Sequence, residues 1–214
     1  MTTAKRSAWF EMRYAEDPRM AVVVMDMAAY DDLVSIDEMA DWAHEHPGWT
    51  GAPQHRWALG QSSENSWSPM ETLTHLVWKI DADLPPMRPN QPVFDRAGHR
   101  IGTPDLLDVE AGLVVQYHGG IHLVGSAPAR DAQAEATYRS HGLQVMNVVA
   151  TDLADRGAMA DRFHRERRAC AFAAESTRAW TIQAPRGWIA THSVALRRGL
   201  DERQRQLVLR YRAA

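Results

Sequence analysis

The sequence predicts an α/β protein in which a mixed sheet flanked by helices follows a small helical unit. Three observations predict this class. Helix-capping signals and helical apolar spacing mark the first 66 residues. From residue 68 onward, signals for a helix, a β-hairpin, a strand, a helix, a strand and a helix follow one another. The segments 113–117 and 143–149 are apolar on both faces, which is typical of central strands.

The first part of the chain contains signals for three helices. Residues 18–33 mix Met, Val and Ala with acidic residues in a helical pattern. Ser35 and Glu38 have the spacing of a capping box and predict the start of a second helix. Residues 52–59 predict a short third helix. The polar residues 61–67 then form a linker, so the helical unit is expected to stand apart from the rest of the chain.

The second part opens with a well-marked helix. Ser68 is suited to the N-cap, Pro69 to the first helical position and Glu71 to the third, and an apolar stripe comes after them. Residues 93–107 read as a β-hairpin with its turn at 95–98. This order, helix and then hairpin, is the expected start of the sheet.

The rest of the sheet alternates with helices. Residues 113–117 predict a central strand, and residues 128–141 predict a helix closed by Gly142, a residue favoured at helix ends. Residues 143–149 predict a second buried strand. A helix is expected to begin near residue 152 and to continue over residues 158–173 as a basic amphipathic helix. Strands that alternate with helices indicate an α/β core.

The C-terminal part differs in composition. Trp180 and Trp188 suggest an extended segment that packs on the domain, and arginines then crowd a short terminal helix. The predicted divisions are a helical unit, a sheet-containing domain and a basic helical tail, at residues 1–66, 67–190 and 191–214.

Composition limits the classes of function. With 45% hydrophobic residues, 24% charged residues and a formal net charge of −3, the chain reads as globular and has no overall basic field. Any DNA contact would therefore use a local patch. The single cysteine, Cys170, excludes an internal disulfide framework and fits a reducing compartment. The apolar run 20–27 is too short to span a bilayer, so we expect a cytoplasmic protein without a membrane partner.

Four residues form the candidate catalytic site. Asp105 lies at a strand end, and Gln116 and His118 lie two residues apart, so they share one face of the next strand. Glu71, on the preceding helix, is within reach of the same cleft. Metal-dependent phosphodiester cleavage needs hard oxygen ligands from two or more carboxylates. The outline fits that chemistry, but Gln116 and His118 stand where carboxylates are expected.

These residues resemble a known family. The chain from residue 68 to about residue 188 is similar to the PD-(D/E)XK endonuclease-like superfamily, and within it to uncharacterised bacterial proteins akin to very-short-patch repair nucleases. In some relatives this domain is the C-terminal part of abortive-infection-antitoxin-like chains, and the segment before residue 68 resembles their connector. The matching positions are residues 68–71 and 102–108, Ala111, Gly112, Tyr117, Gly119, His122, Arg130, Asp131, Gly142, Leu143, Asp152, Leu153, Trp180, Thr181 and Pro185.

The resemblance assigns roles and exposes a departure. It implies that Glu71 is the family's helix glutamate and that Asp105 is its first metal-binding aspartate. The family usually reads Glu-Tyr-Asp-Gly where this chain has Gln-Tyr-His-Gly at 116–119. The site then keeps two acids and loses two negative charges, which weakens its attraction for Mg²⁺. If the site is active, Mg²⁺ or Mn²⁺ is the implied metal.

A transition metal is the alternative ligand. Histidine is a poor ligand for Mg²⁺ and a good one for Zn²⁺. His118 and His122, with Asp105, therefore make an alternative candidate metal site. For single residues, simpler roles stay open: Glu71 as a capping residue, and Asp108 as a turn residue.

Three functions are hypotheses at this point. The first is a nuclease-fold protein with an impaired metal site that binds or processes DNA or binds a protein partner. The second is an active, divergent metal-dependent endonuclease, with His118 or His122 as general base. The third is an interaction or regulatory protein of a phage-defence or toxin–antitoxin system. The candidate DNA-binding residues are Arg130, Arg197, Arg198, Arg203 and Arg205. Two other roles stay open for these arginines. They can lie on a solvated helix face and pair with acidic residues such as Asp131 and Glu135, or they can contact an acidic partner.

Overall fold

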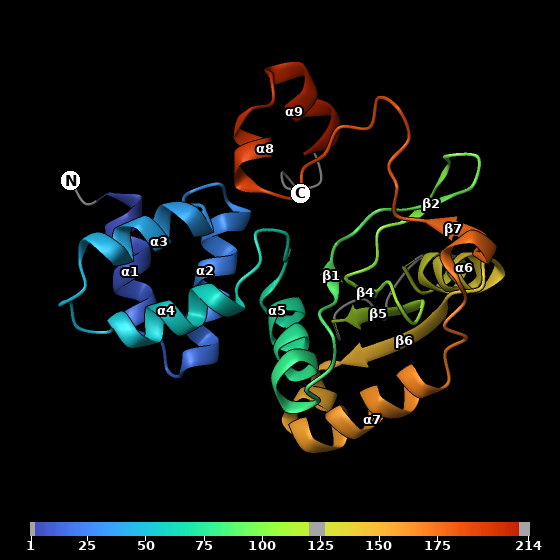
Figure 1. Ribbon diagram of the computed structural model, residues 1–214, viewed down its shortest axis with the longest axis horizontal. Coiled ribbons are helices and arrows are strands. Elements are labelled where there is room, and N and C mark those ends of the chain that lie inside the picture. Colours follow the sequence, from blue (N-terminus) through green and yellow to red (C-terminus); the bar gives the residue numbers. More distant parts are fainter. Residues whose placement is uncertain (1–2, 120–126, 210–214) are drawn as a thin grey trace. The chain divides into compact units, whose positions relative to one another are not determined.

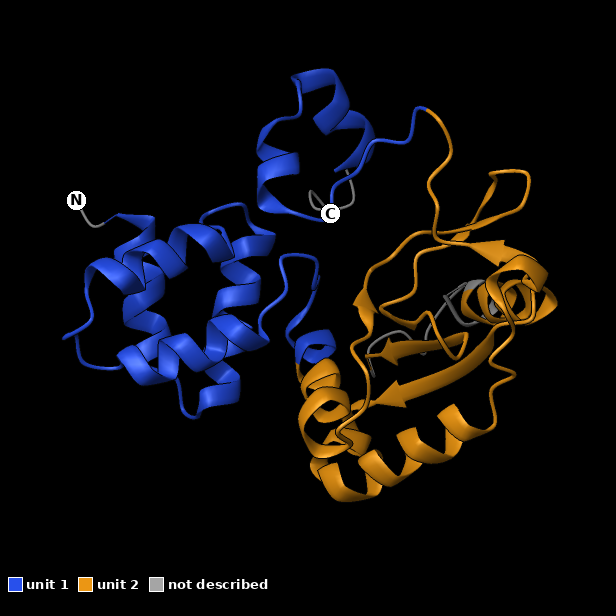
Figure 2. Cartoon of the chain, in the orientation of Figure 1, with its two compact units in different colours: residues 1–72, 187–214 blue, residues 73–186 orange. Residues whose placement is uncertain are grey.

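The computed structural model describes residues 3–119 and 127–209, and the side chains of residues 127–130 are not described. The chain divides into two compact units, residues 1–72 with 187–214 and residues 73–186 (Figure 2). The division after residue 72 lies six residues beyond the expected end of the helical unit. The segment 191–214, expected as a separate tail, belongs to the same unit as the N-terminal helices.

The first unit is helical, as the capping signals predicted (Figure 1). Its N-terminal helices are α1 (Ala4–Tyr14), α2 (Pro18–Tyr30), α3 (Ile36–Glu45) and α4 (Ala52–Gln61). The capping box at the start of α3 is formed, because Glu38 N donates to Ser35 Oγ at 3.0 Å and Ser35 N donates to Glu38 Oε2 at 2.7 Å. Helices α2, α3 and α4 confirm the predictions, and α1 is an additional helix that was not predicted from the sequence.

The helix predicted after residue 68 has two parts. Helix α5 (Pro69–Leu76) is followed by a single wider turn, η1 (Val77–Asp81), with π-helical geometry. Ser68 caps α5, since its Oγ accepts from Glu71 N at 3.2 Å. Trp78 in the wide turn is fully buried, and its indole N–H donates to Pro85 O at 2.6 Å. This bond supplies the partner that a buried indole requires.

The second unit contains a mixed four-stranded sheet, so the α/β class is confirmed. Its strands, in spatial order, are β1 (Arg88–Pro89), β4 (Leu106–Asp108), β5 (Leu113–His118) and β6 (Gln144–Val149). Strands β5 and β6 are parallel, and the other neighbours are antiparallel.

A second, antiparallel sheet corrects the hairpin prediction in part. Strand β2 (Val93–Asp95) lies between β3 (Arg100–Gly102) and β7 (Trp180–Thr181). The hairpin pairing of β2 with β3 is confirmed. The expected strand 99–107 is wrong as a single element, because its two halves, β3 and β4, belong to different sheets. Pro104 between them has no N–H to donate to a ladder, which explains the break.

Helices cover both faces of the mixed sheet (Figure 1). The remaining elements of this unit are α6 (Ala127–Ser140), η3 (Ala150–Ala154), α7 (Arg156–Arg168) and η4 (Glu175–Thr177). Successive residues of β5 point to opposite sides: Val115 packs in the cluster with Phe163 of α7, and Val114 packs in the cluster with Tyr138 of α6. Both valines are fully buried, as predicted for a central strand.

Helix α7 is shorter than expected at both ends. Asp155 caps it by accepting from Ala158 N at 3.0 Å, so the helix begins at Arg156 and not near residue 152 as expected. The helix stops at Arg168, five residues before its predicted end.

The arginine-rich terminal segment forms two helices where one was expected. They are α8 (Val194–Arg198), capped by Ser193, and α9 (Glu202–Val208), capped by Asp201. Gly199, at the C-cap of α8, separates them, in keeping with the low helix propensity of glycine. None of the helices in the described part of the chain is long and apolar enough to cross a membrane.

Candidate functional site

A pocket of about 240 Å³ collects three of the four predicted catalytic residues. It lies between helix α6 and the ends of β5 and β6, within the second unit. Asp105, Gln116 and His118 all line it, as the sequence pattern predicted. The remaining lining residues are Tyr117, Asp131, Ala134, Glu135, Tyr138, Val145 and Asn147.

Strand register explains why these residues meet. Gln116 and His118 share one face of β5, and Asn147 is the direct neighbour of Gln116 on the parallel strand β6. The antiparallel ladder of β4 and β5 ends at the pair Leu106 and Val115. The next position on the β4 side is Asp105, which is therefore opposite Gln116.

Asp105 and Gln116 continue that ladder with their side chains. Tyr117 N donates to Asp105 Oδ2 at 2.6 Å, and Asp105 N donates to Gln116 Oε1 at 3.3 Å. A carboxylate oxygen and an amide oxygen at the positions that the resemblance assigns to metal binding therefore accept hydrogen bonds from the backbone. Their geometry fixes the end of the two strands.

His118 is held between an amide and a carboxylate. Its Nε2 lies 3.1 Å from Asn147 Oδ1, and its Nδ1 lies 3.6 Å from Asp131 Oδ2. The amide of Asn147 is oriented by Glu135, because Asn147 Nδ2 donates to Glu135 Oε2 at 3.1 Å. An amide oxygen only accepts, so the proton on His118 is assigned to Nε2. That nitrogen therefore has no lone pair to offer a metal.

Two further side chains on α6 set the electrostatics of the pocket. The pKa of Glu135 is lowered, first by its hydrogen bond with Arg139 and then by that with Asn147, so this carboxylate stays ionised. Burial raises the pKa of Tyr138, and the neighbouring Asp105 carboxylate raises it further, so the phenol stays neutral. A Cβ atom on Gly102 would lie only 2.3 Å from the Tyr138 hydroxyl oxygen, so glycine leaves the space that the phenol occupies.

The lining residues that were not predicted as members of the site include Asp131, Glu135, Tyr138 and Asn147. One signal was present, since Asn147 is a polar residue within the apolar segment Gln144–Val149. The other three, Asp131, Glu135 and Tyr138, follow one another at spacings of four and three residues, which places them on one face of α6. The alternative expectation, that Glu135 pairs with an arginine, is confirmed by its 2.7 Å contact with Arg139.

Glu71 does not line the pocket. It is a buried residue of the first unit, and its Oε2 accepts from Trp67 N at 2.9 Å, while its own N–H donates to Ser68 Oγ. These contacts correspond to the capping alternative. Asp108 likewise has the turn role, because its Oδ1 accepts from Ala111 N at 3.1 Å.

The donor set near Asp105 does not fit the metal that the resemblance implies. Within residues 3–119 and 127–209, no three His, Cys, Asp or Glu side chains are grouped so as to hold a metal ion. Asp105 and Gln116 direct oxygens to backbone amides, and His118 Nε2 faces Asn147. His122, the other expected ligand of a transition metal, lies outside the described residues.

Arg197 is a structural residue, and its prediction as a DNA contact is corrected. Its side chain is fully buried in the first unit. Its Nε donates to Asp32 Oδ1 at 2.7 Å, and its Nη2 donates to Ala29 O at 2.6 Å. A buried guanidinium that makes four hydrogen bonds within the protein is not accessible to a phosphate.

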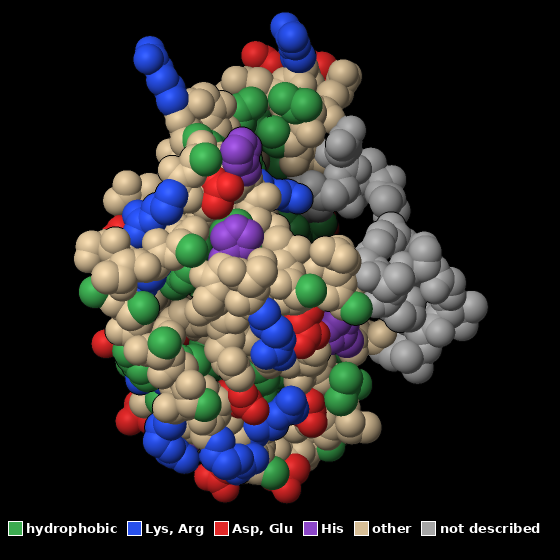
Figure 3. Space-filling model, turned by 90° about the vertical axis from the view of Figure 1, so that its right-hand side faces the viewer, with side chains coloured by type: hydrophobic (Ala, Val, Ile, Leu, Met, Phe, Trp, Pro, Cys, Tyr) green, Lys and Arg blue, Asp and Glu red, His purple; other side chains and the backbone are tan. Residues whose placement is uncertain are grey.

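The other predicted DNA-binding arginines differ in accessibility. Arg198 pairs with Glu38 at 2.8 Å, and Arg205 donates to Arg197 O at 2.8 Å. Arg203, on α9, is exposed, and Arg130 lies on α6 with a side chain outside the description. On the face drawn in Figure 3, Lys and Arg side chains of the described residues are interspersed with Asp and Glu.

Comparisons of the chain with protein-family models, curated proteins and solved structures found no match.

Proposed function

We propose that this chain is a PD-(D/E)XK nuclease-fold protein that binds or processes DNA and has an impaired metal site. The observation that carries the proposal is the exchange of hydrogen bonds between Asp105 and the strand that bears Gln116. The proposed metal-binding positions are occupied by contacts that stabilise the strand ends without a metal ion.

The order and pairing of elements support the nuclease-like fold. Helix α5 is followed by strands, then by α6 and a strand parallel to β5. The pocket lies at the end of that parallel pair, where Asp105, Gln116 and His118 meet. This arrangement supports the proposed fold, with substitutions at the positions where the family has acidic residues.

The chemistry of the substituted residues supports impairment. A Gln116 amide oxygen carries no charge, so it attracts Mg²⁺ far less than a carboxylate does. His118 presents a protonated Nε2 to Asn147, and its other nitrogen faces Asp131. The Nε2 nitrogen of His118 is therefore engaged by Asn147 and is not available to a metal ion.

A cleavage assay tests the proposal. Supercoiled plasmid, nicked plasmid and single-stranded DNA are incubated with the full chain in Mg²⁺ or in Mn²⁺, alongside Asp105→Ala. We expect no cleavage that depends on Asp105, and no heat of Mg²⁺ or Mn²⁺ binding in a calorimetric titration. Cleavage that disappears in Asp105→Ala would overturn the claim of impairment and leave the fold assignment intact.

DNA binding is tested separately from cleavage. A labelled duplex is titrated with the chain at several salt concentrations, and Arg203→Gln is compared with the wild type because Arg203 is exposed. Affinity that falls with salt supports phosphate contacts, since each contact releases counterions. Absence of binding at low salt would remove the DNA-binding part of the proposal.

An active, divergent endonuclease is the second candidate, and one observation favours it. Asp131 and Glu135 bring two further carboxylates to the pocket, besides Asp105. If the chain cleaves DNA, this candidate predicts that Asp131→Asn, Glu135→Gln and Asp105→Ala each lower the rate. An unchanged rate in all three variants would place any cleavage outside this pocket.

A further inference from the structure

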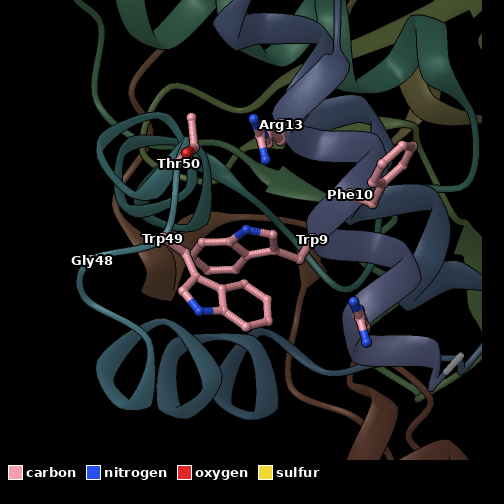
Figure 4. A pocket seen from close by; sticks show the side chains of 7 residues that line it. Trp9, Phe10, Arg13, Gly48, Trp49 and Thr50 are labelled. Carbon is pink, nitrogen blue, oxygen red and sulfur yellow. The ribbon is translucent and has the colours of Figure 1, made fainter.

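The helical unit contains a second, larger pocket with a different composition. It has a volume of about 390 Å³ and is formed by α1 and the loop between α3 and α4 (Figure 4). Its lining includes two cationic side chains and no acidic one. The lining residues are Arg6, Trp9, Phe10, Arg13, Gly48, Trp49 and Thr50.

The pocket results from an unusual stripe on α1. Arg6, Trp9, Phe10 and Arg13 have the spacing i, i+3, i+4 and i+7, which places them on one side of a helix. Trp9 is buried at 3% exposure, whereas Phe10 is 54% exposed. The stripe therefore combines a buried aromatic wall with accessible aromatic and cationic groups.

Aromatic contacts hold the pocket walls in place. The rings of Trp9 and Trp49 meet edge to face with centroids 5.8 Å apart (Figure 4). Trp42 contacts Trp49 in the same manner, with centroids 5.9 Å apart. Trp49 keeps 39% of its surface exposed. An indole that is fixed on one side and open on the other is a suitable stacking platform.

His55 connects helix α1 with the loop that forms the other wall of the pocket. Its ring stacks on Trp9 with centroids 3.6 Å apart, and its two nitrogens each lie 2.8 Å from a carbonyl oxygen, of Gly51 and of Trp9. Gly51 has φ +92°, and a Cβ there would lie 3.0 Å from Cγ of Arg13. The loop and α1 are thus joined by buried contacts, so the pocket is formed before any ligand binds.

The cations of the pocket are available to an anion. Within the described residues, neither the Arg6 nor the Arg13 guanidinium forms an ion pair with a carboxylate. Arg6 and Arg13 are seven positions apart on the helix, which corresponds to a rise of about 10 Å. That spacing suits successive phosphates of a chain better than a single phosphate.

We infer that this pocket binds nucleotide units of a single-stranded nucleic acid. A base stacks on the exposed indole of Trp49, and the backbone phosphates pair with Arg6 and Arg13. Phe10 and Tyr14, whose rings lie 4.6 Å apart and which are 54% and 60% exposed, offer further aromatic surface beside the pocket. The inference concerns the helical unit, so it stands or fails independently of the Asp105 pocket.

Fluorescence anisotropy with a labelled 12-nucleotide oligo-dT tests the inference on the full chain. We expect Trp49→Leu to weaken binding at least about five-fold, because base stacking on an aromatic ring contributes about 1–3 kcal/mol per base. The matched control is Trp57→Leu, since Trp57 has nearly the same exposure, 38% against 39%, and does not line the pocket. We expect that control to bind within about two-fold of the wild type.

The arginines are tested through salt dependence. Removing two phosphate contacts on a single strand lowers the slope of log Kd against log salt by about 1.4. We expect this change in Arg6→Gln/Arg13→Gln and not in Arg56→Gln, because Arg56 is exposed on the same unit and does not line the pocket. Because both arginines are on the surface of α1, this variant keeps the inference testable if Trp49→Leu disturbs folding, which circular dichroism would reveal.

Competitors identify the occupant. Competition by AMP at matched nucleotide concentration would support the same chemistry with a free nucleotide as its source. Equal competition by an oligo-dT·oligo-dA duplex, or by an acidic peptide, would overturn the inference, since neither presents an unstacked base. Failure of the oligonucleotide to bind at low salt, or equal losses in Trp49→Leu and Trp57→Leu, would overturn it as well.

Discussion

Replacing Arg197 by methionine is expected to destabilise the helical unit strongly. The guanidinium is fully buried and makes four hydrogen bonds, to a carboxylate oxygen of Asp32 and to the carbonyl oxygens of Ala29, Glu64 and Thr191, at 2.6–3.0 Å. Methionine fills much of the same volume but donates no hydrogen bond. The variant therefore removes the donors and leaves their acceptors in place.

The size of the effect depends on burial. Removing one partner of a buried ion pair costs about 3–5 kcal/mol. Asp32 keeps 16% of its side chain exposed, so water can solvate it in the variant. We therefore expect about 3 kcal/mol, the lower end of that range, which is a large part of the 5–15 kcal/mol stability typical of a domain.

Urea unfolding monitored by circular dichroism and tryptophan fluorescence measures the loss. Arg203→Met is the matched control, because Arg203 is exposed, and it should change the free energy of unfolding by less than about 0.5 kcal/mol. Adding Asp32→Asn to Arg197→Met should recover part of the loss, since the carboxylate then no longer needs a cation. A loss below about 1 kcal/mol in Arg197→Met would refute the reasoning.

Three further predictions concern one buried carboxyl group and two glycines. Burial raises the pKa of Asp26 from 3.8 to about 6, so its contribution to stability is full below pH 4 and declines by about 3 kcal/mol as pH rises through 6; urea unfolding at pH 4, 5 and 7 should show this decline in the wild type and a flatter profile in Asp26→Asn. Gly102→Ala should lower the free energy of unfolding by about 1–3 kcal/mol, because its Cβ meets the Tyr138 hydroxyl; adding Tyr138→Phe should restore part of the melting temperature, and no restoration would contradict the steric explanation. Gly51→Ala should be destabilised by about 1 kcal/mol or more through its positive φ, and an unchanged thermal melt would argue against a fixed loop.

Local signals were sufficient for most helices and central strands. The capping box at Ser35 and Glu38 and the apolar run of β5 both led to elements that the structure confirms. Helix α1 was not predicted, because the stripe along it mixes arginine with aromatic residues and therefore lacks a plain apolar periodicity. The division of the expected strand 99–107 at Pro104 is set by tertiary structure, since β3 and β4 pair with strands of different sheets.

The candidate site was predictable only along the strands. The two-residue alternation of β5 placed Gln116 and His118 on one face, and Asp105 came from the antiparallel neighbour. The contribution of α6, through Asp131 and Glu135, depends on how that helix packs over the sheet. Helical periodicity says which residues share a face of α6, but the partner of that face is set by long-range packing.

The bonds of Arg197 have a consequence for the order of folding during synthesis. Residues 73–186 are inserted between the two segments of the helical unit, so the N-terminal helices leave the ribosome long before α8. From residue 72 to residue 197 the ribosome adds 125 residues, which takes about 6–25 s at about 5–20 residues per second. During that interval the Arg197 guanidinium is not yet present to bind Asp32 and the carbonyl oxygen of Ala29. The helical unit is therefore completed only after the residues of the sheet have been synthesised.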